Sequence, residues 1–138
     1  MKIIGLAIVT LVFAASCKKQ TINKIEDSIV EGEWKVTLYE DDGNNETSDY
    51  TDYLFKFDSD GSLTVQPGML TVTYFGTWKV EKDSDHVDFI LNFASPIPAN
   101  LEDLSDDWEV LSQSKTKLEL EDVSGGDGSI DKLTFEKI

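Results

Sequence analysis

The pattern of apolar and polar residues changes near Val30 from helical spacing to strict alternation. Ile22, Ile25 and Ile29 recur every three or four residues, which predicts a short amphipathic helix over residues 21–30. From Trp34 onward, apolar side chains alternate with polar ones, as in antiparallel strands that bury one face. The predicted strands lie at residues 34–38, 53–57, 63–65, 72–80, 86–93, 108–110, 118–120 and 133–135.

Residues that favour tight turns separate most of these strands. The run Asp-Ser-Asp-Gly at 58–61 and the run Gly-Gly-Asp-Gly at 125–128 accept positive φ angles, which hairpin turns require. Pro-Gly at 67–68 indicates another turn, whereas the connections at 41–51 and 94–107 are longer. Because short hairpins join the strands in order, the sequence predicts an all-β fold, an eight-stranded antiparallel up-and-down barrel whose closure removes exposed edges.

The N-terminus has a different hydrophobic pattern. After Lys2, the uncharged run at 3–15 is shorter than the about 20 residues that cross a bilayer. Its length and its basic start match a secretory signal. Cys17, the only cysteine, follows directly, and the chain then turns polar. The rest of the chain therefore has no intramolecular disulfide, and its stability rests on packing.

The residues before Cys17, Phe-Ala-Ala-Ser at 13–16, resemble the lipobox of bacterial lipoproteins, although that family prefers Leu at the position of Ala14. The resemblance implies that the Cys17 thiol receives a diacylglycerol and that the chain is cut before it. Two or three acyl chains anchor a protein stably. A plain secretory cut after Ala15 or Ser16 is the alternative. We expect three segments: a signal peptide at 1–16, a lipidated tether at 17–24 and a barrel domain at 25–138.

Several motifs in the barrel domain resemble the small lipocalin-like lipoproteins of bacteria, which are lipid-anchored barrels of the calycin type. Gly32 and Trp34 match the Gly-x-Trp signature that opens the first lipocalin strand after a short helix. Phe-Lys-Phe at 55–57 and Gly-Thr-Trp-Lys-Val at 76–80 match later strands. Lipocalins usually carry an Arg that stacks on the first-strand Trp, and this chain has none. The resemblance is therefore to the looser lipocalin-like group, and it implies binding of a small apolar ligand.

An eight-stranded barrel either fills its interior with side chains or leaves room for one small ligand. Aromatic residues on the inward face are the candidate ligand-binding wall, and the alternative is that they are simply core. Gly76, between two of them, indicates a bend or a cavity. The candidates are Trp34, Phe55, Phe57, Tyr74, Trp78, Phe89 and Phe93.

Charge narrows the choice of partners. The chain has 27 acidic and 12 basic residues, all of the latter Lys, and a net charge of −15. Such a surface repels phosphates, which excludes nucleic acid as a partner. Two hypotheses remain. The protein either carries a small hydrophobic ligand in the cell envelope, or it is an acidic interaction or inhibitor module with a filled barrel and a basic protein partner.

The membrane contact expected for either hypothesis is the acyl chains on Cys17. Because Lys18 follows Cys17, the chain lacks the Asp that retains some lipoproteins at the inner membrane. We therefore expect an outer-membrane anchor that faces the periplasm, with exposure at the cell surface left open.

No residue pattern predicts catalysis, so we expect no enzyme, no catalytic residues and no cofactor. The run at 58–62 begins like a calcium loop but fails the EF-hand pattern at Leu63 and Met69, so a hairpin turn is the better interpretation. His86 is the only histidine, and we expect it at the surface without a metal. One acidic cluster offers weak ligands for a divalent cation, but a solvated loop is favoured: Glu40, Asp41, Asp42, Glu46 and Asp49.

Overall fold

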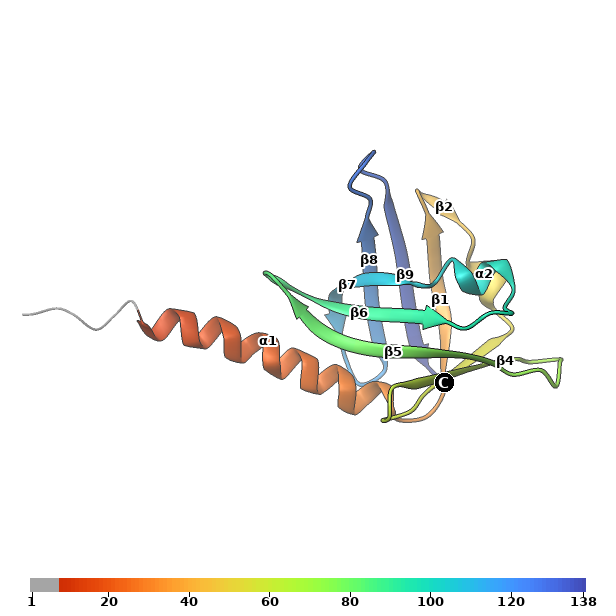
Figure 1. The fold of residues 1–138 in the computed structure, drawn as a ribbon, viewed down its shortest axis with the longest axis horizontal. Coiled ribbons are helices and arrows are strands. Elements are labelled where there is room, and N and C mark those ends of the chain that lie inside the picture. The colour runs from red at the N-terminus through yellow and green to blue at the C-terminus, as the bar shows by residue number, and fades with distance from the viewer. Residues whose placement is uncertain (1–7) are drawn as a thin grey trace, which may run out of the picture.

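The centre of the molecule is a closed β-barrel with a long helix at one end (Figure 1). The computed structural model describes the backbone of residues 8–138 and the side chains of residues 17–138. In chain order, the elements are α1 (Ile8–Ile29), β1 (Trp34–Asp41), β2 (Asn44–Asn45), the 3-10 helix η1 (Thr47–Tyr50), β3 (Tyr53–Phe57), β4 (Ser62–Pro67), β5 (Tyr74–Asp83), β6 (His86–Phe93), α2 (Ala99–Glu102), β7 (Asp106–Gln113), β8 (Lys117–Val123) and β9 (Ile130–Lys137).

Every strand pairs in antiparallel fashion with its neighbour. The order is β2-β1-β3-β4-β5-β6-β7-β8-β9, and β1 also pairs with β9, which closes the barrel. This confirms the eight-stranded up-and-down barrel, to which β2 adds one short outer strand. The β5–β6 hairpin is long, running from Gly76 opposite Phe93 to Asp83 opposite His86. By contrast, β1 meets β3 only where Trp34 faces Phe55.

The turn at 58–61 forms the hairpin that the sequence predicts. The Asp58 amide donates to the Ser62 carbonyl over 2.9 Å, and Gly61 has a φ of 88°. The indole Nε1 of Trp78 donates to the Asp58 carbonyl over 2.9 Å, which fixes this turn against β5. The Asp-rich start of this run therefore serves a β-turn, in which aspartates and glycine are favoured for their backbone geometry.

The helix α1 is longer than the sequence predicts. It covers Ile8–Ile29 without a break, so the expected tether at 17–24 is helical rather than irregular. Its last turns pack on the barrel through Ile25 and Ile29, which are both buried. Lys18 Nζ also donates a 2.9 Å hydrogen bond to the carbonyl oxygen of Ser84, in the turn between β5 and β6. Residues 1–7 of the expected signal peptide lie outside the described residues.

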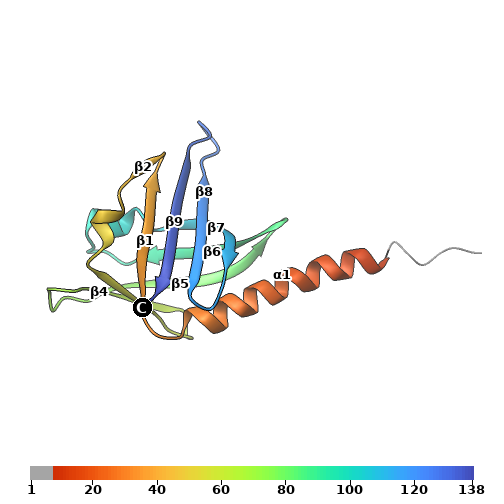
Figure 2. The ribbon, with the colours of Figure 1, turned by 180° about the vertical axis from the view of Figure 1, so that it is seen from behind.

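Side chains from every strand of the barrel except the short β2 meet in one core. Alternate residues of each strand point inward, which is the arrangement expected from period-two sequences. Seen from behind, α1 leaves the barrel beside the β7–β8 turn (Figure 2). Besides the aromatic residues, the core contains Val36, Leu63, Val65, Val80, Val87, Leu91, Leu118, Leu120 and Leu133.

Candidate functional site

The aromatic residues predicted to line the barrel interior are packed against one another. Phe57 lies edge-on to Trp78, Phe89 and Phe135, with ring centroids 6.1, 5.7 and 5.6 Å apart. Aromatic pairs prefer such edge-to-face geometry, which stabilises a core beyond the area it buries. Trp34, Phe55, Phe57, Trp78 and Phe89 are all buried, whereas Tyr74 and Phe93 are partly buried at the edge of the core.

The end of the barrel next to α1 is closed by that helix. Ile25 and Ile29 lie against Trp34 and Leu118, and the apolar gap that these side chains share has a volume of only about 10 Å³. A gap of this size holds one water molecule at most. A ligand of the usual size needs a cavity of several hundred Å³.

The opposite end of the barrel is closed by η1 and α2. Tyr50 of η1, Leu101 of α2 and Leu104 just after it are each at most 1% exposed. The Tyr50 hydroxyl donates to the Asn100 carbonyl over 2.7 Å, and the Asn100 side-chain amide donates to the Asp49 carbonyl over 3.0 Å. These hydrogen bonds hold the two short helices together across the end of the barrel. In the part of the chain that the structure describes, the interior therefore offers packing rather than a ligand cavity.

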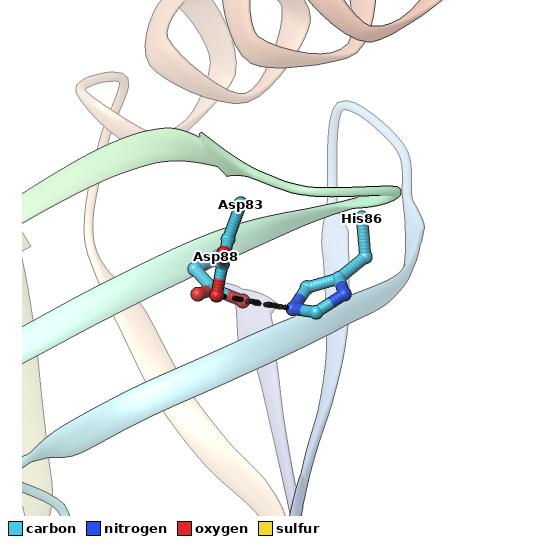
Figure 3. Close-up of side chains that lie close together, drawn as sticks. All are labelled: Asp83, His86 and Asp88. Atoms are coloured by element: carbon cyan, nitrogen blue, oxygen red, sulfur yellow. Dashed lines mark ion pairs between the residues drawn. The ribbon is translucent and has the colours of Figure 1, made fainter.

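The outer face of the β5–β6 hairpin carries a cluster of a different kind (Figure 3). Asp83 and His86 face each other across the turn, and Asp88 lies two residues further along β6 on the same face. The Nε2 atom of His86 is 3.1 Å from Asp88 Oδ1 and 3.6 Å from Asp83 Oδ2. Within residues 17–138, these are the only three His, Cys, Asp or Glu side chains found with ligand atoms all within 4.8 Å of one another.

Asp88 is the unusual member of this cluster, because it is a carboxylate that is 5% exposed. Its Oδ1 lies 3.1 Å from His86 Nε2 in an ion pair, but among the described residues no hydrogen bond reaches that oxygen. Burial raises the pKa of Asp88 above its ordinary value, against the lowering effect of the nearby His86. A buried carboxylate without a donor is costly and requires an explanation.

A hollow of about 330 Å³ adjoins the cluster and is lined by residues of β5, β6, β7 and β8. Asp88 pairs with Glu109, and Glu109 pairs with Glu121, so like charges stand directly opposite one another across three strands. Such pairs destabilise a sheet unless a cation compensates them. The carboxylates that line the hollow are Asp83, Asp88, Asp107, Glu109, Glu121 and Asp122.

His86 responds to these charges. Partial burial lowers the pKa of the imidazole, but the hydrogen bond to Asp85 and the charges of Asp88, Glu109 and Asp83 outweigh it, so the pKa is raised. The sequence analysis placed His86 at the surface without a metal site and did not predict this cluster. The available signal was the spacing of Asp83, His86 and Asp88 around a two-residue turn, which puts all three on one face of a hairpin.

The acidic cluster at residues 40–49, weighed as a weak cation site, is dispersed over the end of β1, the residues on either side of β2, and η1. The Asp42 amide donates to Asp131 Oδ1 over 2.9 Å, and the Asp41 carboxyl interacts with Asp131, whose charge raises the pKa of Asp41. Asp131 belongs to β9, so this part of the acidic surface is a contact between strands rather than a loop that surrounds an ion. The prediction of a solvated loop, favoured over a cation site, describes the exposed residues of this cluster better than a cation site does.

Cys17 lies on α1 and is exposed, and its carbonyl oxygen accepts a 3.0 Å hydrogen bond from the Thr21 hydroxyl. No helix in the described part of the chain combines the length and apolarity needed to cross a membrane. Comparison of the chain with protein-family models and with curated protein sequences finds no match.

Proposed function

We propose that the protein is a lipid-anchored, lipocalin-like binding module of the cell envelope, which acts through its outer surface on a basic protein partner. The observation that carries this proposal is the filled barrel. Phe57, Phe89 and Trp78 occupy the interior, and helices close both ends. The outer surface is therefore the place where binding is favoured, and the filled-barrel hypothesis is preferred over the carrier of a hydrophobic ligand.

The surface has features that suit a protein partner. The net charge of −15 favours a basic partner, because complementary charge speeds encounter and selects against other partners. In the loop between β4 and β5, Met69 and Leu70 are 91% and 60% exposed, and Val72 and Phe75 nearby are also exposed. A small apolar centre within a polar surface is the usual anatomy of an interface.

The position of this loop fits a tethered module. The β4–β5 loop and the N-terminal end of α1 lie on opposite sides of the barrel in both views (Figure 1, Figure 2). With acyl chains on Cys17, the apolar loop would point away from the membrane. Anchor and binding surface would then lie at opposite ends of one rigid domain.

The filled interior gives the sharpest test. Full-length protein in detergent should take up neither a fluorescent fatty acid nor benzene, measured by fluorescence and by ligand-observed NMR. As a positive control, Phe89→Ala should bind benzene, because a buried aromatic replaced by Ala leaves an apolar cavity that stays dry and accepts such molecules. Saturable uptake of the fatty acid by the wild type, abolished by filling or blocking the interior, would favour the carrier instead.

Photo-crosslinking in cells that produce the protein tests for the partner. The crosslinking residue replaces Met69 or, as a control, Ile130, which is exposed on β9. We expect one main adduct with a basic protein from Met69, weakened by salt because exposed charges are screened. Equal adducts from both positions, or adducts insensitive to salt, would contradict a charge-guided interface.

A further inference from the structure

We propose that Asp83, His86 and Asp88 form a binding site for a divalent first-row transition ion such as Zn²⁺. The site lies on the outer face of the β5–β6 hairpin, on the other side of the hairpin from α1 (Figure 3). It is independent of the protein partner proposed above. Four observations carry the proposal: the spacing of the ligand atoms, the unsatisfied oxygen of Asp88, the position of Asp85 and the charge of the hollow.

The spacing of the ligand atoms matches a metal site. Zn²⁺ binds imidazole nitrogen and carboxylate oxygen at about 2.0–2.2 Å in a tetrahedral arrangement, so two of its ligand atoms lie about 3.3–3.6 Å apart. The distances from His86 Nε2 to Asp88 Oδ1 and to Asp83 Oδ2 are 3.1 and 3.6 Å. An ion between them would need only small movements of exposed side chains, because Asp83 is largely exposed. Three protein ligands leave the fourth position open.

Asp88 points to a ligand independently of this spacing. The side chain is more than nine-tenths buried, it faces His86 and Asp83, and its Oδ1 has no hydrogen-bond donor within residues 17–138. A buried carboxylate in this state is stabilised either by losing its charge or by gaining a cation. A metal ion bound by His86 and Asp83 would supply that cation at the oxygen that lacks a hydrogen-bond donor.

Asp85 prepares His86 for this role. Its Oδ1 lies 3.3 Å from the Nδ1 atom of His86, on the side of the ring away from Asp83 and Asp88. When the proton is on Nδ1, that nitrogen donates to Asp85, and Nε2 keeps a free lone pair toward the two carboxylates. A carboxylate that holds the second nitrogen of a metal-binding histidine fixes the ring and strengthens the ligand. Asp85 would thus be a positioning residue.

The chemistry of the ligands selects the type of ion. Imidazole suits Zn²⁺, Cu²⁺ and Ni²⁺, whereas Ca²⁺ and Mg²⁺ prefer oxygen ligands alone. Glu109 and Glu121 add negative charge to the hollow next to Asp88, so a divalent cation would also relieve repulsion between neighbouring strands. The alternative is a simple ion pair, in which a protonated His86 compensates Asp88 and no metal binds.

Zinc titration of the full-length chain in detergent, prepared with a histidine-free tag, distinguishes these possibilities. We expect one Zn²⁺ per chain by isothermal titration calorimetry. The nitrogen-15 NMR signal of the imidazole Nε2 atom should shift on addition of Zn²⁺. The assignment of this signal is unambiguous because His86 is the only histidine. His86→Gln and Asp88→Asn should each weaken binding at least tenfold, and Asp85→Asn should weaken it to a smaller extent.

Asp127→Asn is the matched control, because it removes the same charge from an exposed hairpin turn between β8 and β9 and should leave Zn²⁺ affinity unchanged. Circular dichroism of each variant verifies folding, and His86→Gln carries the test where Asp88→Asn does not fold. Absence of saturable Zn²⁺ uptake would overturn the proposal. Uptake that survives His86→Gln, or Ca²⁺ binding as tight as Zn²⁺ binding, would overturn it as well.

Discussion

At the scale of single residues, Gly76 shows how closely the strands approach. The sequence suggested that the missing side chain makes a bend or a cavity. A Cβ atom at this position would lie 2.5 Å from the Asn92 carbonyl oxygen and 3.1 Å from Cδ1 of Phe93. The space beside Gly76 is thus occupied by the backbone of β6. Glycine is required in β5 for close contact between strands, which is a common reason for glycine inside a strand.

Gly76→Ala should therefore lower the free energy of unfolding by about 1–3 kcal/mol, the usual cost of an added methyl group in a site without room. Urea denaturation followed by tryptophan fluorescence measures this difference. The matched control is Gly126→Ala, since a Cβ there has no neighbour within 4 Å. That variant should stay within about 0.5 kcal/mol of the wild type. Equal losses in both variants would mean that contact with Asn92 is not the cause.

At the scale of elements, the strands were predictable because their inward faces alternate along the sequence. Tyr53, Phe55 and Phe57, for example, show the period of two in the letters alone. The length of α1 could not be predicted from the sequence, because the apolar run before Cys17 has the same composition whether it is a signal or a helix. The closure of the far end was missed for another reason. Tyr50 and Leu101 belong to long connections, and only tertiary contacts place them over the core.

The candidate site was missed for a related reason. Asp83 and Asp88 are common surface residues in an acidic chain, and their grouping with His86 depends on the register of the hairpin. A shift by one residue would send Asp88 to the opposite face. The burial of Asp88 depends further on its neighbours in β5 and β7, which no local pattern reveals.

The predicted lipid anchor at Cys17 of α1 can be tested directly with a variant. Cys17→Ser should lose labelled palmitate and should move from the membrane fraction to the soluble fraction, because the acyl chains are the expected membrane contact. The barrel should remain folded, since Ile25 and Ile29 hold the helix by contacts beyond Cys17. Ser16→Ala, which keeps the thiol, is the control and should stay labelled. Palmitate in the Cys17→Ser chain would contradict lipidation at this residue.

At the scale of the whole molecule, acidic groups on β1, β7, β8 and β9 act on one another's pKa values. Burial, together with the charges of Asp106 and Asp131, raises the pKa of Asp122 to about 6. Asp131 raises the pKa of Asp41 in the same region. The charges that act most strongly on the Asp122 and Asp41 carboxyls are all negative. The folded chain thus holds protons near neutral pH that the unfolded chain would release.

This difference fixes the direction of the pH dependence. Between the ordinary pKa of an Asp, 3.8, and about 6, folded Asp122 binds more proton than the unfolded chain does, so stability should fall as pH rises through this range. Because Asp122 is partly exposed to solvent, we expect the free energy of unfolding to fall by about 1 kcal/mol, or Tm to fall by about 3–5 °C, between about pH 4 and pH 6. Thermal melts with a chelator present measure this change in Tm. Asp122→Asn should flatten the profile, whereas Asp127→Asn, whose carboxyl has a pKa lowered by hydrogen bonds from Ser129, should not. A profile unchanged by Asp122→Asn would assign the slope to the net charge of the chain instead.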